Sequence, residues 1–456
     1  MEVKDEKEQG IKDEKIINAN PTKQFFISML VRDIALEPAI AELVDNSLDG
    51  AKKFRKLSGF TDMCKIDVSF DENKFYISDT CGGISYEDAR EYCFRFGRDN
   101  SRPFDLDNGT GVFGIGMKRA LFRMGKVFDI VSKTPTEHFS IHVDVDTWLK
   151  DEGTDWTFEF TELGRNEKNP LSECGTTIIV SDLYDPIRYS FTNPYFRDSF
   201  HKYIMRRSSM IKDLNVQVII NGKNIIYEDI KILFGKSFSP YVQHLTLDDV
   251  NITVIAGCAK MGEPKNAGWY VSCNSRMVLF ANQKEETGWG TEDIRAFHPS
   301  YASFRGIVLF ESANLENLPW NTTKTGVDSS SKYYQRALEI MRDVERSYIS
   351  WRKEVDEFIA ANEEIDAKSI FSDTEYDINS PAIQKHLVEN SDFGLPELNS
   401  TNFPVPPEPR TSIPFRVEKS KVQNIKEHLN KPKMSNKEVA EVIFNYFYER
   451  EIDEDE

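Results

Sequence analysis

A long amphipathic helix, followed at once by a β-hairpin, limits the folds open to this chain. Residues 41–53, AELVDNSLDGAKK, have helical periodicity, and KIDVSF (65–70) and KFYISD (74–79) alternate apolar and polar residues around the turn DEN. The apolar side of the helix consists of Leu36, Ile40, Leu43, Val44 and Leu48. Such a face must be covered by a sheet or another helix. The pattern predicts an α+β domain with helices on one side of a mostly antiparallel sheet.

Strand-like segments continue along the chain and indicate two sheets. The first four are VFDIVSKT, FSIHVDVDTW, DWTFEFTEL and GTTIIVSDL, the last at residues 175–183. A helix is predicted near 193–212. The later segments are NVQVIINGK, VNITVIAGCA, GWYVSCNSRMVLF and FRGIVLFES. These favour a second, smaller α/β domain with at least one covering helix.

The C-terminal third is predicted to be helical and interrupted by a linker. A helix over 332–362 has apolar residues in steps of four and three: Ala337, Met341, Val344, Tyr348, Trp351, Val355 and Phe358. This seam fits packing against the protein's own second domain or an intermolecular coiled coil. Residues 363–416, which include VPPEPRTSIP, read as a linker. The predicted boundaries are an arm at 1–24, domains at 25–185 and 186–331, and an acidic helical tail at 417–456.

Composition excludes several classes of protein. The 456 residues carry a net charge of −18, which argues against a surface that is basic throughout. HKYIMRRSSMIK (201–212) is the best local basic patch, although a solvated helix face explains it as well. The sequence has no apolar run of membrane-spanning length and no N-terminal signal region, so we expect an intracellular, cytoplasmic protein. The six cysteines never reach a C-x-x-C spacing, which indicates neither a zinc site nor a disulfide framework.

The predicted helix carries a polar stripe of Glu42, Asp45, Asn46 and Asp49. Positions i, i+3, i+4 and i+7 share one helix face, so these four side chains lie together. Three acids on one stripe repel each other unless a positive group lies above them. A solvated face is the plain alternative, and for an isolated amphipathic helix it is the commoner one.

Asp79 ends a predicted strand and begins the sequence Asp-Thr-Cys-Gly-Gly (79–83). A carboxylate at a strand end can accept a hydrogen bond from an amine edge such as adenine N6, and the glycines let a flat group approach the backbone. Aspartate before two glycines is more often only a turn. The motif alone therefore decides nothing.

Residues 108–118, NGTGVFGIGMK, carry four glycines in eight residues before a predicted helix. Free amides and a helix N-terminus can hold phosphate. The dinucleotide fingerprint does not fit, because RPFDLDN is no buried strand. A P-loop does not fit either, because Met117 stands where its lysine belongs. Far downstream, Lys324 in Asn-Thr-Thr-Lys (321–324) could reach a terminal phosphate, with a plain surface lysine as the alternative.

Together these segments resemble the GHKL ATPases, the superfamily of gyrase B, the heat-shock chaperones, histidine kinases, MutL and MORC proteins. The order is Glu-x-x-Asp-Asn, Asp-x-x-Gly-Gly, Gly-x-x-Gly-x-Gly, Gly-Thr-Thr (175–177) and a downstream lysine, over about residues 20–330. GVFGIGMK (111–118) is especially similar to the MORC loop, and the second half resembles the transducer domain of MutL, MORC and gyrase B. Cys81 departs from the pattern, since it replaces the first glycine of Asp-x-Gly-x-Gly. The resemblance implies a Bergerat-type ATP-binding sandwich, a transducer-type α/β domain and a helical tail.

The resemblance also implies a role for each motif residue. Glu42 would orient and deprotonate the attacking water, Asn46 would ligate Mg²⁺, and Lys324 would sense the γ-phosphate of ATP. Asp45 and Asp49 would shape the field around metal and base. Asp79 would read adenine, supported by the hydroxyl of Thr177. The other residues expected at the nucleotide are Gly83, Ile84, Asn108, Gly111, Val112, Phe113, Gly114, Ile115, Gly116 and Lys118.

The predicted function is an Mg²⁺-dependent ATPase that works as an ATP-gated homodimeric clamp or switch. A MORC-like role on nucleic acid or in a defence system follows by analogy alone, with DNA or a protein as a partner of the C-terminal tail. The alternative is an ATP-stabilised scaffold, or chaperone-like partner-binding protein, with negligible turnover. Glu42 argues against that alternative, because a pure binder needs no base there. A histidine kinase fits poorly, because only about 20 residues precede the fold.

Overall fold

The computed structural model describes residues 21–32, 34–96, 116–150, 156–208, 214–235, 238–291, 293–321, 323–361, 371, 373–389, 413–414 and 416–451. Within these residues the first sheet has eight strands in the order β5-β4-β3-β6-β2-β1-β7-β8. Its strands are β1 (Cys64–Phe70), β2 (Phe75–Asp79), β3 (Gly125–Lys133), β4 (Glu137–Asp144), β5 (Phe160–Arg165), β6 (Gly175–Leu183), β7 (Val216–Ile220) and β8 (Lys223–Asn224). Every neighbouring pair is antiparallel except β1 and β7.

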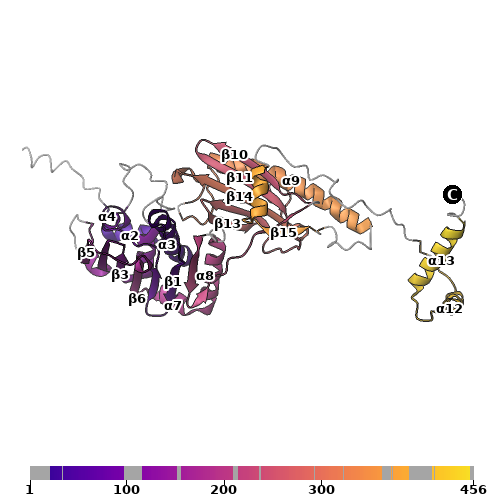
Figure 1. The fold of residues 1–456 in the computed structure, drawn as a ribbon, viewed down its shortest axis with the longest axis horizontal. Coiled ribbons are helices and arrows are strands. Elements are labelled where there is room, and N and C mark those ends of the chain that lie inside the picture. The colour runs from indigo at the N-terminus through magenta and orange to yellow at the C-terminus, as the bar shows by residue number, and fades with distance from the viewer. Residues whose placement is uncertain are drawn as a thin grey trace, which may run out of the picture. The chain divides into compact units, whose positions relative to one another are not determined.

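Helices cover one side of this sheet, as the amphipathic pattern predicts (Figure 1). They are α2 (Lys23–Arg32), α3 (Leu36–Ser58), α4 (Tyr86–Asp88), α5 (Gly116–Met124), α6 (Val145–Lys150), α7 (Asp185–Thr192) and α8 (Pro194–Arg207). The alternate residues of β1 are buried, and they share one core with the apolar side of α3. The predicted α+β class is thereby confirmed.

Two local predictions in this domain are corrected. The strand at 215–223 was assigned to the second sheet, but Val216–Ile220 pairs in parallel with β1 and extends the first sheet past residue 185. The segment FSIHVDVDTW is not one strand, because β4 ends at Asp144 and α6 begins at Val145. The Asp144 carboxylate accepts a hydrogen bond from the Thr147 N–H at 2.8 Å, which favours a helix start over further extension.

The N-terminal arm is only partly within the described residues. Residues 1–20 lie outside them, and α2 begins at Lys23. Phe26 packs edge-on against Phe96 and Trp156 of its own domain. The side chain of Phe25 is 58% exposed. Directly after the predicted arm, the chain therefore packs on its own first domain through Phe26.

The second sheet has five strands within the described residues, in the order β10-β11-β14-β12-β13. They are β10 (Tyr241–Leu247), β11 (Val250–Cys258), β12 (Gly268–Cys273), β13 (Arg276–Asn282) and β14 (Phe304–Ser312). A separate ribbon joins β9 (Lys231–Phe234) to β15 (Thr374–Asp377), followed by α11 (Pro381–Glu389). The linker predicted over 363–416 is therefore wrong for residues 374–389, where Ile378 and Ile383 are buried in the core of the second domain. Nearly all of β12 and β14 is buried, which explains their continuous apolar sequences.

Helix α9 (Lys332–Ala361) packs its heptad seam on the protein's own second domain. Ala337, Met341, Val344, Tyr348, Trp351 and Val355 are all buried. Tyr348 contacts the ring of Phe304 and hydrogen-bonds with Ser303 at 2.9 Å. The predicted helix is therefore confirmed, and of the two alternatives the described residues support intramolecular packing.

Glu345 is a buried carboxyl group on this same seam. It accepts a hydrogen bond from Trp269 Nε1 at 2.7 Å, while its Oε2 has no partner within the described part of the chain. Burial raises the pKa of Glu345 from 4.5 to about 8. At neutral pH the folded protein therefore keeps a proton that the unfolded chain releases.

Glu345→Gln should flatten the pH dependence of stability. A raised folded pKa gives stability that is present below pH 4.5 and is lost as the pH rises toward 8. We expect the wild type to lose roughly 2–4 kcal/mol of unfolding free energy between pH 5 and 8 through this group, and the variant to lose much less. Denaturant unfolding at both pH values measures this. Glu339→Gln, an exposed position of α9, should behave as the wild type. A wild-type stability that does not fall over this range contradicts the assignment.

A second compact unit contains residues 358–364 and 405–456. It carries α12 (Lys419–His428) and α13 (Asn436–Glu451), so the tail predicted to be helical does contain helices. In the described parts of the chain, no helix has the length and apolar content that a membrane crossing requires.

Candidate nucleotide site

Helix α3 carries the polar stripe, and the structure divides it into a buried and an open half. Glu42 and Asp45 are 7% and 4% exposed, whereas Asn46 is exposed and Asp49 is half-buried. The glycine that begins α5, Gly116, lies directly against Glu42, since a Cβ there would be 2.7 Å from Glu42 Oε2. The predicted base and the end of the predicted phosphate loop are therefore adjacent.

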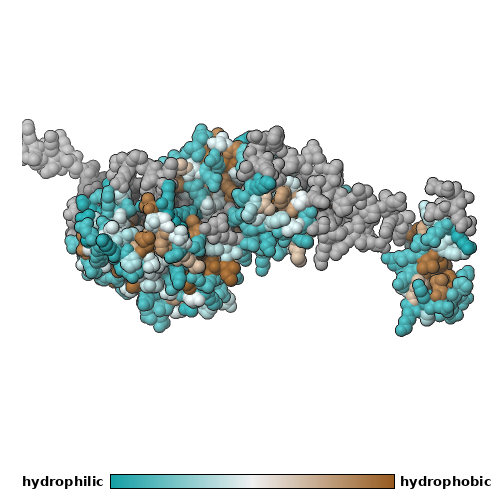
Figure 2. Space-filling view, viewed as in Figure 1, coloured by the Kyte–Doolittle hydropathy of each residue, from teal (hydrophilic) through white to brown (hydrophobic). Residues whose placement is uncertain are grey.

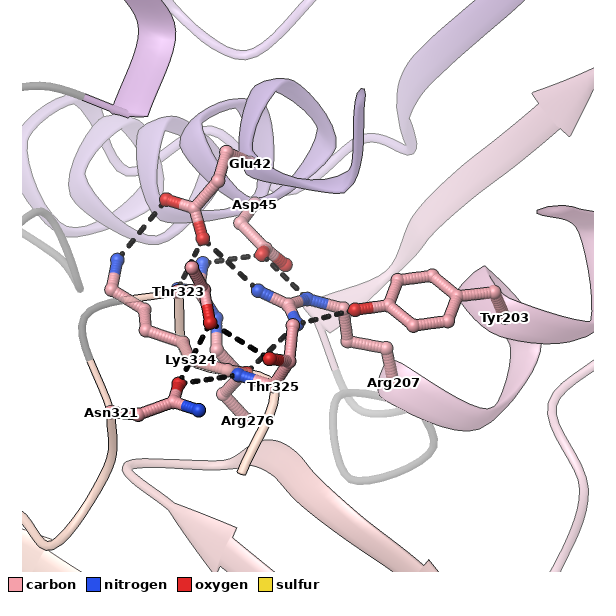
Figure 3. Close-up of polar contacts among 9 residues, drawn as sticks. All are labelled: Glu42, Asp45, Tyr203, Arg207, Arg276, Asn321, Thr323, Lys324 and Thr325. Atoms are coloured by element: carbon pink, nitrogen blue, oxygen red, sulfur yellow. Dashed lines mark hydrogen bonds and ion pairs between the residues drawn. The ribbon is translucent and has the colours of Figure 1, made fainter. Parts of the chain in front are cut away.

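Three cationic side chains surround the two buried carboxylates (Figure 3). Arg207 of α8 donates to Glu42 Oε1 at 3.1 Å and to Asp45 Oδ2 at 2.9 Å. Arg276, the first residue of β13, lies 3.4 Å from Glu42 Oε1 and 2.5 Å from Asp45 Oδ2. Lys324 Nζ donates to Glu42 Oε2 at 3.2 Å. The repulsion between the Glu42 and Asp45 carboxylates is thus offset by basic side chains of the protein itself.

This cluster sets the charge state of Glu42 and Lys324. Burial alone would raise the pKa of Glu42, but Arg276, Lys324 and Arg207 outweigh it and lower the pKa from 4.5 to about 2. Burial and the neighbouring Arg276 lower the pKa of Lys324 from 10.5 to about 8, against the opposite pull of Glu42. Glu42 is therefore a carboxylate at neutral pH and, with these partners, a weak base.

Lys324 lies in a compact turn that follows β14 of the second sheet. Asn321 Oδ1 accepts hydrogen bonds from the Thr325 N–H and the Thr323 hydroxyl, both at 3.0 Å. Lys324 itself has a φ of 52°, a left-handed conformation that costs a non-glycine residue free energy. Its carbonyl accepts from Arg207 at 3.1 Å. Hydrogen bonds on both sides of Lys324 hold this conformation and place the ammonium group at Glu42.

Asp79 lies at the end of β2 with both carboxylate oxygens engaged. Oδ1 accepts the N–H groups of Cys81 at 2.9 Å and Thr176 at 3.2 Å, and Oδ2 accepts the Ser47 hydroxyl at 2.7 Å. Burial raises the pKa of Asp79 above its usual value, and these three hydrogen bonds oppose that rise. Oδ2 keeps a lone pair for a further donor, as recognition of an adenine amine requires.

The predicted support of Asp79 by the Thr177 hydroxyl is wrong. Thr177 hydrogen-bonds with Ser78 at 2.8 Å, because the antiparallel register sets these two residues opposite each other. The hydroxyl that supports Asp79 belongs to Ser47 on α3, next to Asn46 in the sequence. The sequence gives one signal, the position of Ser47 between the stripe residues Asn46 and Asp49, but its contact to β2 depends on tertiary packing.

Backbone packing explains the glycines after Asp79. Gly82 and Gly83 have φ values of 96° and 74°, in the region that favours glycine. A Cβ on Gly83 would lie 2.1 Å from the carbonyl oxygen of Lys133. The adjacent Ile84 N–H donates to Ser132 at 2.6 Å. These contacts fix the turn beside Asp79, while contacts of Gly83 and Ile84 to a nucleotide stay a prediction.

The predicted phosphate loop lies mostly outside the residues that the structure describes. Asn108, Gly111, Val112, Phe113, Gly114 and Ile115 lie outside the described residues. Lys118 is within them, on α5, and is buried with its Nζ donating to the Cys93 carbonyl at 2.7 Å. Burial lowers the pKa of Lys118 to about 8. Its predicted contact to phosphate stays a prediction.

Two cluster residues were not predicted as site residues. Arg207 belongs to the basic segment 201–212, which suggested a surface patch, yet it is only 4% exposed. Arg276 begins a strand of the second sheet, and nothing local in the sequence marks it. The acidic stripe did predict that a positive group was needed, but it did not identify which residues supply the charge.

Comparison with known proteins agrees with this geometry. Residues 34–174 match the family described as "Histidine kinase-, DNA gyrase B-, and HSP90-like ATPase". The match spans α3, the Asp79 turn and the glycine-rich segment, and it supports a GHKL-type ATPase domain in the first half of the chain. No curated protein matches the chain.

Asp79→Asn should weaken ATP binding. The NH2 group of the new amide would face hydrogen-bond donors that now bind the carboxylate. The side chain would also lose one of the two oxygens that can accept a hydrogen bond from the adenine amine. We expect ATP affinity to fall by roughly tenfold to a hundredfold. Isothermal titration calorimetry measures it, with Asp67→Asn, an exposed residue of β1, as the control. Equal wild-type affinity for ATP and GTP would count against adenine reading.

Proposed function

We propose that the protein binds ATP and Mg²⁺ in its first domain, hydrolyses ATP, and uses the cycle to change the contact between that domain and the second sheet. The observation that carries this proposal is the hydrogen bond of Lys324 to Glu42. It joins the predicted base on α3 to the turn that follows β14. A group that binds near Glu42 therefore acts on both domains.

Mg²⁺ fits the donors at the open half of the stripe. Asn46 is exposed one helical turn after Glu42, and its amide oxygen is a hard ligand. In the described residues, no three His, Cys, Asp or Glu side chains gather into a metal site. Mg²⁺ in nucleotide sites takes most of its ligands from phosphate and water, so one or two protein ligands are enough to hold it. When bound, Mg²⁺ would offset the charge of the phosphates. Asp49, half-buried on the same face, would add negative charge behind Asn46.

The cluster supports a switch in which Lys324 controls the base. With a pKa of about 2, Glu42 is a poor proton acceptor at neutral pH. A γ-phosphate beside Gly116 would compete with Glu42 for the Lys324 ammonium group. Transfer of Lys324 to the phosphate frees Glu42 Oε2, raises its basicity, and lets it orient and deprotonate water. ATP binding would thereby activate the base.

Lys324→Ala should leave ATP affinity nearly unchanged but lower turnover by about 10²-fold, the usual cost of losing one charged group at a transition state. It should also uncouple the two domains. In the wild type, ATP and ADP should give different limited-proteolysis patterns, and in the variant the same one. Lys332→Ala, an exposed lysine that pairs with Asp248, is the control. Identical patterns for ATP and ADP in the wild type contradict the switch.

The finer proposal is a homodimeric clamp with a MORC-like role. ATP would close the dimer through the first domain, and the tail would bind DNA or a protein. In the tail, α13 exposes Val442, Ile443, Phe444, Tyr446, Phe447 and Tyr448, and Figure 2 shows apolar side chains gathered there. An uncovered apolar surface of this kind favours a protein partner.

Light scattering with and without a non-hydrolysable ATP analogue tests the dimer. Specific activity that is constant over a hundredfold dilution, with monomer alone present, contradicts it.

A second candidate is an ATP-stabilised scaffold with negligible turnover. The low pKa of Glu42 favours it, because a carboxylate held by three cations is a structural group as well as a weak base. ATP would then raise the melting temperature without measurable phosphate release. A phosphate-release assay beside a melting curve separates the two functions, and Mg²⁺-dependent release above background excludes the scaffold.

A further inference from the structure

Cys64 and Cys81 are two free, buried thiols beside the Asp79 turn. The register of β1 and β2 pairs Ile66 with Asp79, so two residues further along Cys64 lies opposite Cys81. The pair between them, Lys65 and Thr80, shares the hydrogen bond from Thr80 N–H to Lys65 O at 3.0 Å. Cys64 and Cys81 are therefore a non-hydrogen-bonded pair, the position at which opposing side chains come closest.

The two thiols influence each other's ionisation. The neighbouring thiol lowers the pKa of Cys64 and raises that of Cys81. Arg55 Nη2 lies 3.6 Å from Cys64 Sγ. Cys81 and the guanidinium of Arg55 lower the pKa of Cys64 to about 7, against the effect of burial. A lower pKa gives Cys64 more thiolate at neutral pH than an ordinary cysteine has.

We propose that Cys64 and Cys81 form a reversible disulfide that weakens nucleotide binding at Asp79. The second half of this proposal rests on the proposed ATP site. Such a bond would also give a role to the cysteine that departs from the glycine of the GHKL pattern.

Hydrogen peroxide would supply the oxidising equivalents. The Cys64 thiolate attacks one peroxide oxygen, the O–O bond breaks, and water leaves after protonation, which gives a sulfenic acid on Cys64. The Cys81 sulfur then attacks the Cys64 sulfur. The S–S bond forms, the S–O bond breaks, and a second water leaves with the Cys81 proton. With hydrogen peroxide, two thiols and one peroxide give one disulfide and two waters. Residues 61–63, next to Cys64 in the chain, are exposed, whereas Cys64 itself is buried, so the oxidant has to enter at this end of β1.

The bond would disturb Asp79 because Cys81 helps to hold it. A disulfide brings the two sulfurs to roughly 2 Å, closer than two unbonded sulfur atoms can approach, so Cys81 must move toward β1. Its N–H donates to Asp79 Oδ1 at 2.9 Å, and the next N–H, of Gly82, donates to the Cys174 carbonyl at 2.9 Å. Gly83 cannot follow freely, because it packs against the Lys133 backbone. The movement of Cys81 therefore shifts the Asp79 carboxylate or breaks its hydrogen bond with the Cys81 N–H.

The test begins with the wild-type full chain and hydrogen peroxide. Cys64 and Cys81 lie in separate tryptic peptides, residues 57–65 and 75–90, each with one cysteine. After thiol blocking, non-reducing mass spectrometry should find these two peptides joined, with a mass two hydrogens below their sum, and dithiothreitol should separate them. Both thiols still free, or either one joined to another cysteine, would overturn the pairing. This readout needs no variant and no nucleotide.

The second measurement is ATP affinity by calorimetry, before oxidation, after it, and after dithiothreitol. We expect about a tenfold loss that dithiothreitol reverses. Cys64→Ser should lose the sensitivity to peroxide, and Cys258→Ser, a buried thiol of β11, should keep it. A linked protein with unchanged ATP affinity overturns the effect on binding. If the reduced protein binds no ATP, both the proposed function and the effect of the disulfide on binding are wrong. Mass spectrometry then still shows whether Cys64 and Cys81 form the disulfide.

Discussion

Glu42→Gln should retain ATP binding and lose ATP turnover by roughly 10² to 10⁴, the range for removal of a positioned base. Glutamine keeps the shape of the side chain and an oxygen for Arg207 and Arg276, so the cluster stays assembled around Asp45. What it loses is the second acceptor oxygen, which now faces Lys324 at 3.2 Å and would receive the proton of the attacking water. The effect should therefore be on turnover and not on affinity.

Single-turnover phosphate release, together with ATP affinity by calorimetry, measures both effects. Glu72→Gln, in the exposed turn between β1 and β2, is the matched control and should hydrolyse ATP as the wild type does. Near-normal hydrolysis by the Glu42 variant would remove Glu42 from the catalytic role. The cluster would then be a structural joint between the domains.

Arg207→Ala should destabilise the protein by about 3–5 kcal/mol, the cost of leaving buried charges unpaired. Arg207 is 4% exposed and donates to Glu42, Asp45, the Tyr203 hydroxyl and the Lys324 carbonyl. Alanine leaves Arg276 as the one remaining guanidinium among the described contacts of Asp45. It also removes the support that holds the Lys324 turn against α8.

Thermal and denaturant unfolding measure the loss, and Lys202→Ala is the control. Lys202 lies on the same helix but is exposed, so its removal should change stability by less than about 0.5 kcal/mol. An Arg207 variant as stable as the control would mean that the desolvation of the cluster offsets its attraction. Buried ion pairs can reach that balance, but they do so when both partners are replaced together.

Part of the site was predictable because its signals are local. Helical periodicity put Glu42, Asp45, Asn46 and Asp49 on one face, and alternation defined the hairpin that ends at Asp79. The match of residues 34–174 to a GHKL-type ATPase family agrees with those motifs. The heptad steps of α9 likewise identified the buried side of that helix. Each of these patterns depends on residues a few positions apart.

Strand pairing was predicted less well. The segment 216–220 reads as a strand, but no local pattern shows which sheet it joins. Its parallel pairing with β1 depends on the path of α7 and α8, which return the chain to the far side of the hairpin. The Thr177 error has the same origin. The sequence contains the hydroxyl, and only the register of β2 and β6 directs it to Ser78.

The amino-acid order by itself determined the α+β class, the acidic stripe with its need for a positive partner, and the Asp79 turn. The tertiary structure decided what supplies the positive charge. Arg207, Arg276 and Lys324 reach Glu42 from 165, 234 and 282 residues away. Contacts over such separations arise when two sheets and their helices pack, and no periodicity of a single segment encodes them. Charge neutralisation was foreseeable from the repulsion of like charges, whereas the identity of the cations required the folded chain.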